Sequence, residues 1–237
     1  MRIGVFDSGL GGINVLSCLI KKYPNNEYVY FGDTKNLPYG DKNKEELLKL
    51  ASDAIDFLIS KNVDLIIIAC GTISSNCYDE LRKKYSIPLY DIISPTINYL
   101  KKYELDKIGV IGTSRTIESG IFNIEGKSIL MKATPNLVPI IENNSIYENK
   151  DNIIQELNEF NDYDLLVLGC THYPILKDII EKNINTKTLD MGEVLIDSIN
   201  LTNSGEYKCE LYFSLVSVNL INNINNILGD NYQIYIK

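Results

Sequence analysis

The chain has 237 residues, 45% hydrophobic and 23% charged, a balance typical of a globular protein with an ordinary core. The formal net charge of −8 and the isoelectric point near 4.8 argue against a nucleic-acid or membrane partner, because either would need a basic surface. No apolar run approaches the roughly 20 residues of a membrane span, and no signal peptide is evident. We therefore expect a cytoplasmic protein.

Apolar runs of strand length alternate along the chain with segments of helical period. The predicted strands are residues 3–6, 28–31, 65–69, 108–111 and 165–168. Residues 45–60 have helical period, and 174–182 open with proline, which suits the first turn of a helix. The period places one apolar stripe on the first of these helices, formed by Leu47, Leu48, Ala51, Ile55, Leu58 and Ile59. The last stretch, from residue 201, ends in a strand-like alternation at 232–236. This order predicts the α/β class with mainly parallel sheets.

Two short patterns occur twice. DLIIIAC at 64–70 is answered by DLLVLGC at 164–170, and RIGVFDS at 2–8 by KIGVIGT at 107–113. Two echoes in the same order at nearly the same offset indicate a duplicated unit. We predict two similar doubly wound α/β domains related by a pseudo-twofold axis, formed by residues 1–93 plus 200–237 and by 94–199. Open α/β sheets bind ligands at their strand ends, so the active site is expected in the cleft between the domains.

The cysteines divide into two groups. Cys70 and Cys170 each end a predicted strand directly before a helical segment, where backbone N–H groups and the helix dipole favour the thiolate and lower the thiol pKa. We expect both to face the cleft as bases. Cys18, Cys77 and Cys209 lie in apolar patterns, for which packing is the simpler explanation. An odd number of dispersed cysteines fits neither a disulfide framework nor a zinc site.

Acid and base side chains accompany both cysteines. The single histidine, His172, follows Cys170 by two residues, and imidazole exchanges protons near pH 7. Asp7 and Ser8 follow the first predicted strand and precede a glycine cluster at 9–12, whose N–H groups suit a carboxylate. One histidine with scattered cysteines does not supply a metal site, and the phosphate-loop pattern is absent. We expect neither metal nor cofactor, and chemistry by acids and bases alone.

Taken together, the motifs resemble the glutamate racemases of the aspartate/glutamate racemase superfamily. The matching strings follow the order of that family and span most of the chain. They are GVFDSGLGG at 4–12, YFGDT at 30–34, PYG at 38–40, Ala69-Cys70 with Thr72, GVIGT at 109–113, Val138-Pro139 with Glu142, and LGCTHYP at 168–174.

The resemblance implies cofactor-independent interconversion of L- and D-glutamate for peptidoglycan precursors, in an active site between two α/β domains. Cys70 resembles the base for one enantiomer and Cys170 the base for the other. Asp7 would assist Cys70, and His172 with Glu142 would assist Cys170. The implied substrate contacts are Asp7, Ser8, Tyr39, Gly40, Cys70, Gly71, Thr72, Thr113, Cys170, Thr171 and His172. Family members commonly form homodimers, and a homodimer is expected here.

One position departs from the family, which usually has asparagine directly after the first cysteine; here it is Gly71. Loss of one polar contact to a buried substrate costs about 0.5 to 3 kcal/mol unless another group replaces it. Aspartate, or another amino acid, is therefore the alternative substrate. Two further alternatives are a thiol hydrolase or transferase that uses Cys170 and His172, and an amino-acid-binding relative that has lost catalysis.

Overall fold

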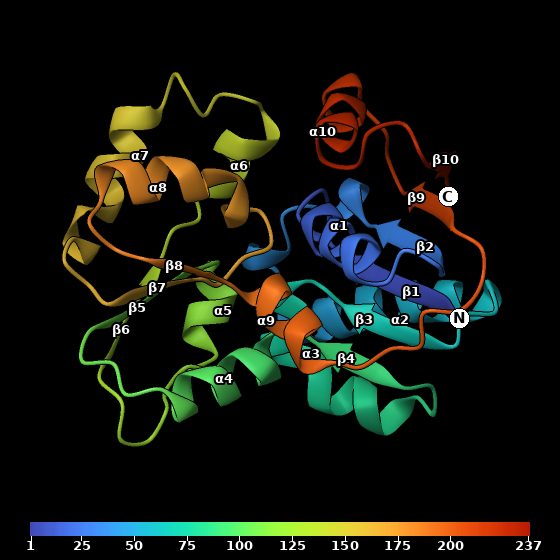
Figure 1. Cartoon of the computed structure of the whole chain (residues 1–237), viewed down its shortest axis with the longest axis horizontal. Helices are drawn as coiled ribbons and strands as arrows, with labels where there is room; N and C mark the ends of the chain where they lie inside the picture. Colours follow the sequence, from blue (N-terminus) through green and yellow to red (C-terminus); the bar gives the residue numbers. More distant parts are fainter.

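A computed structural model describes all 237 residues and contains two sheets that lie side by side (Figure 1). Every strand pairing in both sheets is parallel. Sheet A has the order β10 (Gln233–Ile236), β9 (Lys208–Phe213), β2 (Glu27–Gly32), β1 (Arg2–Asp7), β3 (Leu65–Ile68) and β4 (Leu89–Asp91). Sheet B has the order β6 (Ile129–Ala133), β5 (Ile108–Gly112), β7 (Leu165–Leu168) and β8 (Thr188–Asp190). We call the part that carries sheet A the first half and the part that carries sheet B the second half.

Helices cover both sheets. They are α1 (Gly12–Lys22), α2 (Lys44–Ser60), α3 (Gly71–Lys84), α4 (Ile93–Lys102), α5 (Ser114–Glu118), α6 (Leu137–Glu142), α7 (Lys150–Leu157), α8 (Lys177–Asn183), α9 (Met191–Ser198) and α10 (Val218–Leu228). Short 3-10 helices lie at Thr34–Asn36, Tyr39–Asp41, Asn158–Phe160 and Tyr173–Leu176. No helix is both long and apolar enough to cross a membrane.

Two of the predicted helices show how local signals act. Asn43 and Glu46 form a capping box that starts α2 one residue before the predicted segment, and most of the predicted stripe is buried. Ile59, also predicted on that stripe, is 40% exposed. The proline-led segment begins as the 3-10 helix Tyr173–Leu176 and becomes regular only in α8.

The duplication inferred from the sequence is present in both sheets. The order β2-β1-β3-β4 of sheet A matches β6-β5-β7-β8 of sheet B. The register matches as well, since Ile3 pairs with Leu65 in the first half and Ile108 with Leu165 in the second. The side chains of Asp64 and Asp164 accept equivalent hydrogen bonds from the backbones of Arg2 and Lys107. The predicted fold class, two similar parallel α/β domains, is therefore confirmed.

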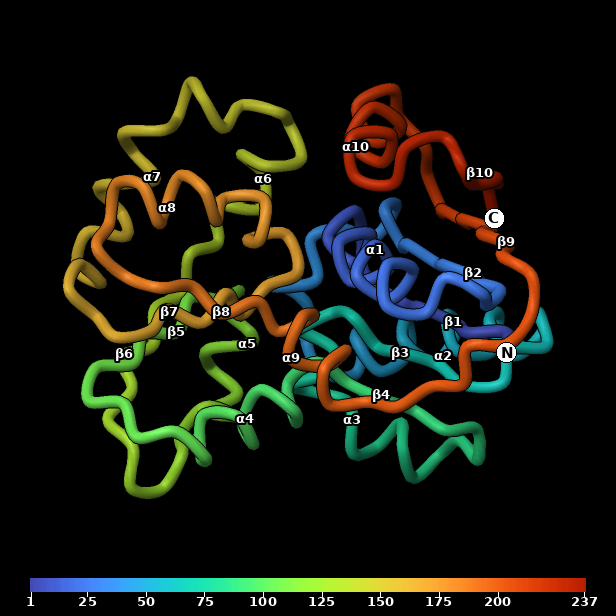
Figure 2. The backbone as a smooth tube through the Cα atoms, in the orientation of Figure 1, coloured from blue at the N-terminus to red at the C-terminus, as the bar shows by residue number.

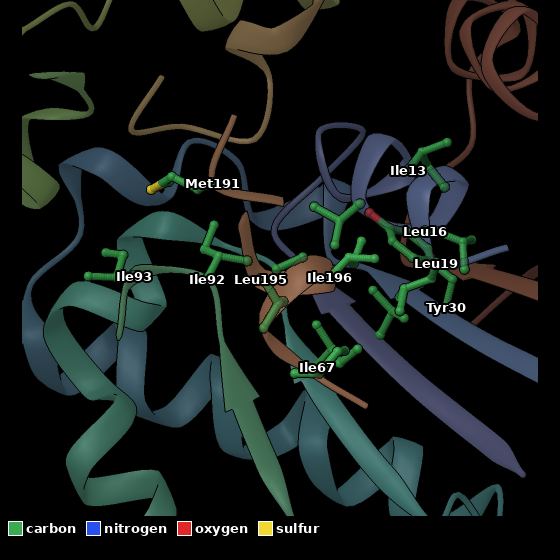
Figure 3. Close-up of a cluster of buried hydrophobic side chains, with 14 of the residues drawn as sticks. Ile13, Leu16, Leu19, Tyr30, Ile67, Ile92, Ile93, Met191, Leu195 and Ile196 are labelled. Carbon is green, nitrogen blue, oxygen red and sulfur yellow. The ribbon is translucent and has the colours of Figure 1, made fainter. Parts of the chain in front are cut away.

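One apolar core joins the two halves. Figure 3 shows Leu195 and Ile196 of α9 beside Leu16 of α1 and Ile92 at the start of α4, all of them buried. Figure 2 shows the chain passing between the halves at α4 and again after α9. The final segment places β9 beside β2 and β10 beside β9, in sheet A. The predicted boundaries at residues 93 and 199 stay predictions.

Candidate active site

A cavity of about 270 Å³ lies where the carboxyl ends of β1 and β3 meet those of β5 and β7. Ten of the predicted site residues line it: Ser8, Tyr39, Gly40, Cys70, Gly71, Thr72, Thr113, Cys170, Thr171 and His172. Two predicted residues, Asp7 and Glu142, do not. A larger, open groove of about 740 Å³ between α4 and α9 contains none of the predicted residues. The chemistry-bearing side chains therefore gather in the smaller cavity.

Cys70 follows β3 and caps the start of α3, where it is 3% exposed. Its thiol donates a hydrogen bond to the Ser8 hydroxyl over 3.6 Å. Burial, and then the negative charge of Asp7, raise the pKa of the Cys70 thiol to about 12, against the lowering effect of bonds from Ile73 and Ser8. The expectation that the helix start lowers this pKa is therefore wrong for Cys70, because desolvation outweighs the dipole.

Asp7 lies behind the cavity wall and is fully buried. One carboxylate oxygen accepts a bond from the backbone N–H of Gly9 at 2.9 Å, and the other from the hydroxyl of Thr171 at 3.1 Å. Because Thr171 belongs to the second half, Asp7 connects the two halves next to Cys70. Its charge raises the pKa of the Cys70 thiol, although the carboxylate does not line the cavity.

Cys170 has a different neighbourhood. Its sulfur lies 3.6 Å from Nδ1 of His172, and Nε2 of His172 lies 2.7 Å from Oε1 of Glu142. Burial lowers the pKa of His172, but the hydrogen bonds and charges of Cys170 and Glu142 raise it well above its usual value. The imidazole is thus held cationic beside the sulfur. Glu142, the last residue of α6, lines a separate cavity of about 130 Å³.

Hydroxyl groups from both halves border the cavity. The hydroxyls of Thr72 and Thr113 lie 2.9 Å apart, and Thr113 also caps α5. The first N–H groups of α3, beginning at Gly71, lie at the same wall. Hydroxyls and helix-start N–H groups together suit a carboxylate.

Tyr39 reaches the cavity in a way that the sequence did not indicate. Its hydroxyl donates to Oδ2 of the buried Asp33 at 2.8 Å, so this group is committed within the protein. Asp33 also accepts bonds from the side chains of Asn36 and Ser214, and it thereby ties the segment before Gly40 to the end of β9. Asp33 was missed as a supporting residue, although it lies within the matched string at 30–34.

The remaining cysteines lie outside the cavity. Cys77 and Cys209 are buried, Cys18 is partly buried, and all five cysteines are free thiols. Burial raises the pKa of Cys77 to about 11 and that of Cys209 to about 12. No group of three or more His, Cys, Asp or Glu side chains could hold a metal ion.

Two free thiols thus line one cavity at equivalent strand ends of the two parallel α/β halves. A family model described as Asp/Glu/Hydantoin racemase matches residues 24–199. The chain is 36% identical to the glutamate racemase of Aquifex aeolicus over 98% of its length and 96% of that protein. It is 37% identical to the glutamate racemase of Fusobacterium nucleatum over 90% of its length and 87% of that protein.

Solved structures agree. The glutamate racemase of Francisella tularensis, determined with D-glutamate, superposes with a TM-score of 0.87 at 29% identity, over 100% of this chain and 97% of that one. The enzyme of Aquifex pyrophilus gives 0.84 at 34% identity, over 100% and 98%. The chain belongs to the Asp/Glu/Hydantoin racemase family, and it is an isomerase of the amino-acid racemase type.

Proposed function

We propose that this racemase interconverts L- and D-glutamate through Cys70 and Cys170, one on each face of the α-carbon. The observation that carries the proposal is the placement of both thiols in one cavity at equivalent strand ends. The names of the relatives, glutamate racemases at 36% identity over nearly the whole chain, support glutamate as the substrate.

In the proposed reaction, the thiolate of one cysteine removes the α-proton and becomes a thiol. The electron pair of the broken C–H bond passes into the adjacent carboxylate, so the α-carbon becomes planar. The thiol on the opposite face then gives its proton to that carbon and becomes a thiolate. The reverse reaction exchanges the two roles, and atoms and charges balance in both directions.

The neighbours of the cysteines support distinct roles. The raised pKa of Cys70 keeps it as a thiol near neutral pH, ready to donate a proton. Cationic His172 lies beside Cys170, and Glu142 holds its far nitrogen. For the opposite direction Cys70 must first lose its proton, with Asp7 as the nearby carboxylate.

Substrate carboxylates would be held by hydroxyls and backbone N–H groups. The candidates are Ser8, Gly40, Gly71, Thr72, Thr113 and Thr171. Tyr39 would act through its backbone and ring, because its hydroxyl is bound to Asp33. A supply of D-glutamate for peptidoglycan, a cytoplasmic location and a homodimer stay predictions.

The test is circular dichroism of L-glutamate, and separately of D-glutamate, with purified protein and no added cofactor. We expect both signals to decay to zero, faster than those of the aspartate enantiomers. If only the aspartate signals decay, the substrate is aspartate and not glutamate. Tight binding without decay for every amino acid would favour a binding protein, and a trapped acyl group on Cys170 would favour a thiol hydrolase.

A further inference from the structure

Two glycines of the first half contact the backbone of the second half beside the cavity. A Cβ built on Gly71 would lie 2.8 Å from the carbonyl oxygen of Gly169, and one built on Gly11 would lie 2.7 Å from His172 N and from Thr171 C. Real Cβ atoms essentially never approach other atoms closer than 3.0 Å. We call Gly11 and Gly71 the closure glycines, since no side chain fits at either position in this arrangement.

Hydrogen bonds cross between the halves at the same two places. Next to Gly11, the side chain of Asn14 donates to the carbonyl of Thr171 at 3.2 Å. Next to Gly71, the hydroxyl of Thr72 meets that of Thr113 at 2.9 Å. At both closure glycines, the backbones of the two halves therefore approach closely and hydrogen bonds hold them together.

The Gly71 contact connects the two cysteine positions directly. Gly71 follows Cys70 in the chain, and the carbonyl it touches belongs to Gly169, which precedes Cys170. The other neighbour of a Cβ on Gly71 would be the end of the Met191 side chain at 3.5 Å, an ordinary contact. Any side chain at position 71 must therefore move one backbone against the other.

We propose that the closure glycines are positioning residues whose missing side chains let the two halves close, and that this closure sets the separation of Cys70 and Cys170. The inference rests on the proposed two-cysteine reaction. It also assigns a purpose to Gly71: a residue without a side chain leaves room for the carbonyl of Gly169.

The Gly71→Asn variant distinguishes a closure role of Gly71 from the mere loss of a polar contact to the substrate, because the two predict opposite changes in activity. If Gly71 only lacks a substrate contact, Gly71→Asn raises kcat/KM, and Gly71→Ala changes little. If Gly71 sets the closure, both variants lower kcat, because both add the same Cβ against Gly169. A displacement of about 1 Å can cost on the order of 100-fold in rate.

The experiment follows both enantiomers of glutamate in D2O with Gly71→Ala, Gly71→Asn and Gly11→Ala. NMR measures exchange of the α-proton in recovered substrate, and circular dichroism measures inversion. When the thiols lie farther apart, the carbanion waits longer for the second thiol. The first thiol then has time to exchange its proton with D2O and to return a deuteron to the face from which the proton came. We expect kcat to fall about 10- to 100-fold, and the ratio of exchange to inversion to rise. A general loss of stability would lower both rates together and leave the ratio unchanged.

Gly112→Ala is the matched control, because a Cβ there meets only the Ile117 and Thr116 side chains of its own half, at 3.3 to 3.4 Å. It should keep the wild-type ratio. Gly11 and Gly71 both lack a positive φ, so alanine suits their backbones, and either variant can test the inference if the other fails to fold. Wild-type ratios in Gly71→Ala and Gly11→Ala would overturn the inference. A wild-type chain that neither exchanges nor inverts would instead overturn the proposed function.

Discussion

Cys70 and Cys170 follow equivalent strands, but the helices after them and their electrostatic surroundings differ. Both cysteines follow strands in matching register. Cys70 has a hydroxyl at 3.6 Å and the buried carboxylate of Asp7 nearby, whereas Cys170 has the cationic ring of His172 at 3.6 Å. Duplication of the fold thus places two thiols symmetrically, and the side chains around them make the thiols unequal. In the proposed reaction each turnover starts with one sulfur protonated and the other not, and the unequal surroundings favour one of these two arrangements over the other.

The largest effect should come from removing either sulfur. Cys70→Ala and Cys170→Ala each take away one of the two proton carriers, so inversion in both directions should fall by about 10⁴-fold. Cys77→Ala and Cys209→Ala are controls, since both residues are buried away from the cavity. Circular dichroism of glutamate measures the rates. Near-normal inversion by either cleft variant would refute the two-base scheme.

Replacing His172 changes the surroundings of Cys170 and leaves those of Cys70 as they are. His172→Gln removes the positive charge beside Cys170, and we expect about a 100-fold loss of kcat. Glu142→Gln keeps the ring but weakens its support, so the loss should be about tenfold. The loss of kcat should be larger for the enantiomer that Cys170 deprotonates, with a correspondingly lower KM for it, because kcat/KM stays equal in the two directions when the enantiomers are equally stable. Saturation curves from each pure enantiomer measure both quantities. Equal losses in the two directions would count against distinct roles for the two halves.

The pH dependence of Cys70 alkylation tests whether this thiol stays protonated near neutral pH. Burial and the charge of Asp7 raise its pKa to about 12, so the reactive thiolate is scarce below that value. Alkylation of Cys70 by iodoacetamide should therefore rise about tenfold per pH unit between pH 7 and 9, without a plateau. Asp7→Asn removes the second cause, lowers the pKa, and should speed alkylation several-fold at pH 8. Peptide mass spectrometry gives both rates, and a plateau near pH 8 in the wild type would contradict the prediction.

The smallest expected effect concerns the segment before Gly40. Tyr39→Phe removes one hydrogen bond to Asp33 while Asn36 and Ser214 keep theirs. We expect a loss of about 0.5 to 1.5 kcal/mol in the free energy of unfolding and a several-fold rise in KM. Urea unfolding and initial rates measure these two quantities. Tyr235→Phe is the control, because it changes an exposed tyrosine that does not line the cavity. An unchanged KM in Tyr39→Phe would show that the segment before Gly40 does not position the substrate.

Much of this molecule could be predicted from local patterns. The repeated strings at 64–70 and 164–170 located the ends of two equivalent strands, because buried parallel strands appear in a sequence as short apolar runs. The chain also gathers the predicted residues in one cavity, apart from Asp7 and Glu142. Glu142 came only from the family resemblance, since no local pattern links it to His172, thirty residues away.

Three features depended on contacts between distant segments. The pKa of Cys70 follows from burial that no spacing reveals. The Tyr39 hydroxyl binds Asp33 only because a 3-10 turn folds back on it. The contact of Gly71 with Gly169 arises only when the halves pack together. A pattern specifies elements and strand ends, whereas solvation and close approach depend on the assembled structure.

The most direct test of the central claim is the first turnovers of L-glutamate and of D-glutamate in D2O, followed by NMR and circular dichroism. Two bases on opposite faces predict that the product carries deuterium at the α-carbon while the remaining substrate keeps its proton. A product that retains the original α-proton would show that one group serves both faces, and it would contradict the assignment of Cys70 and Cys170 as opposed proton carriers.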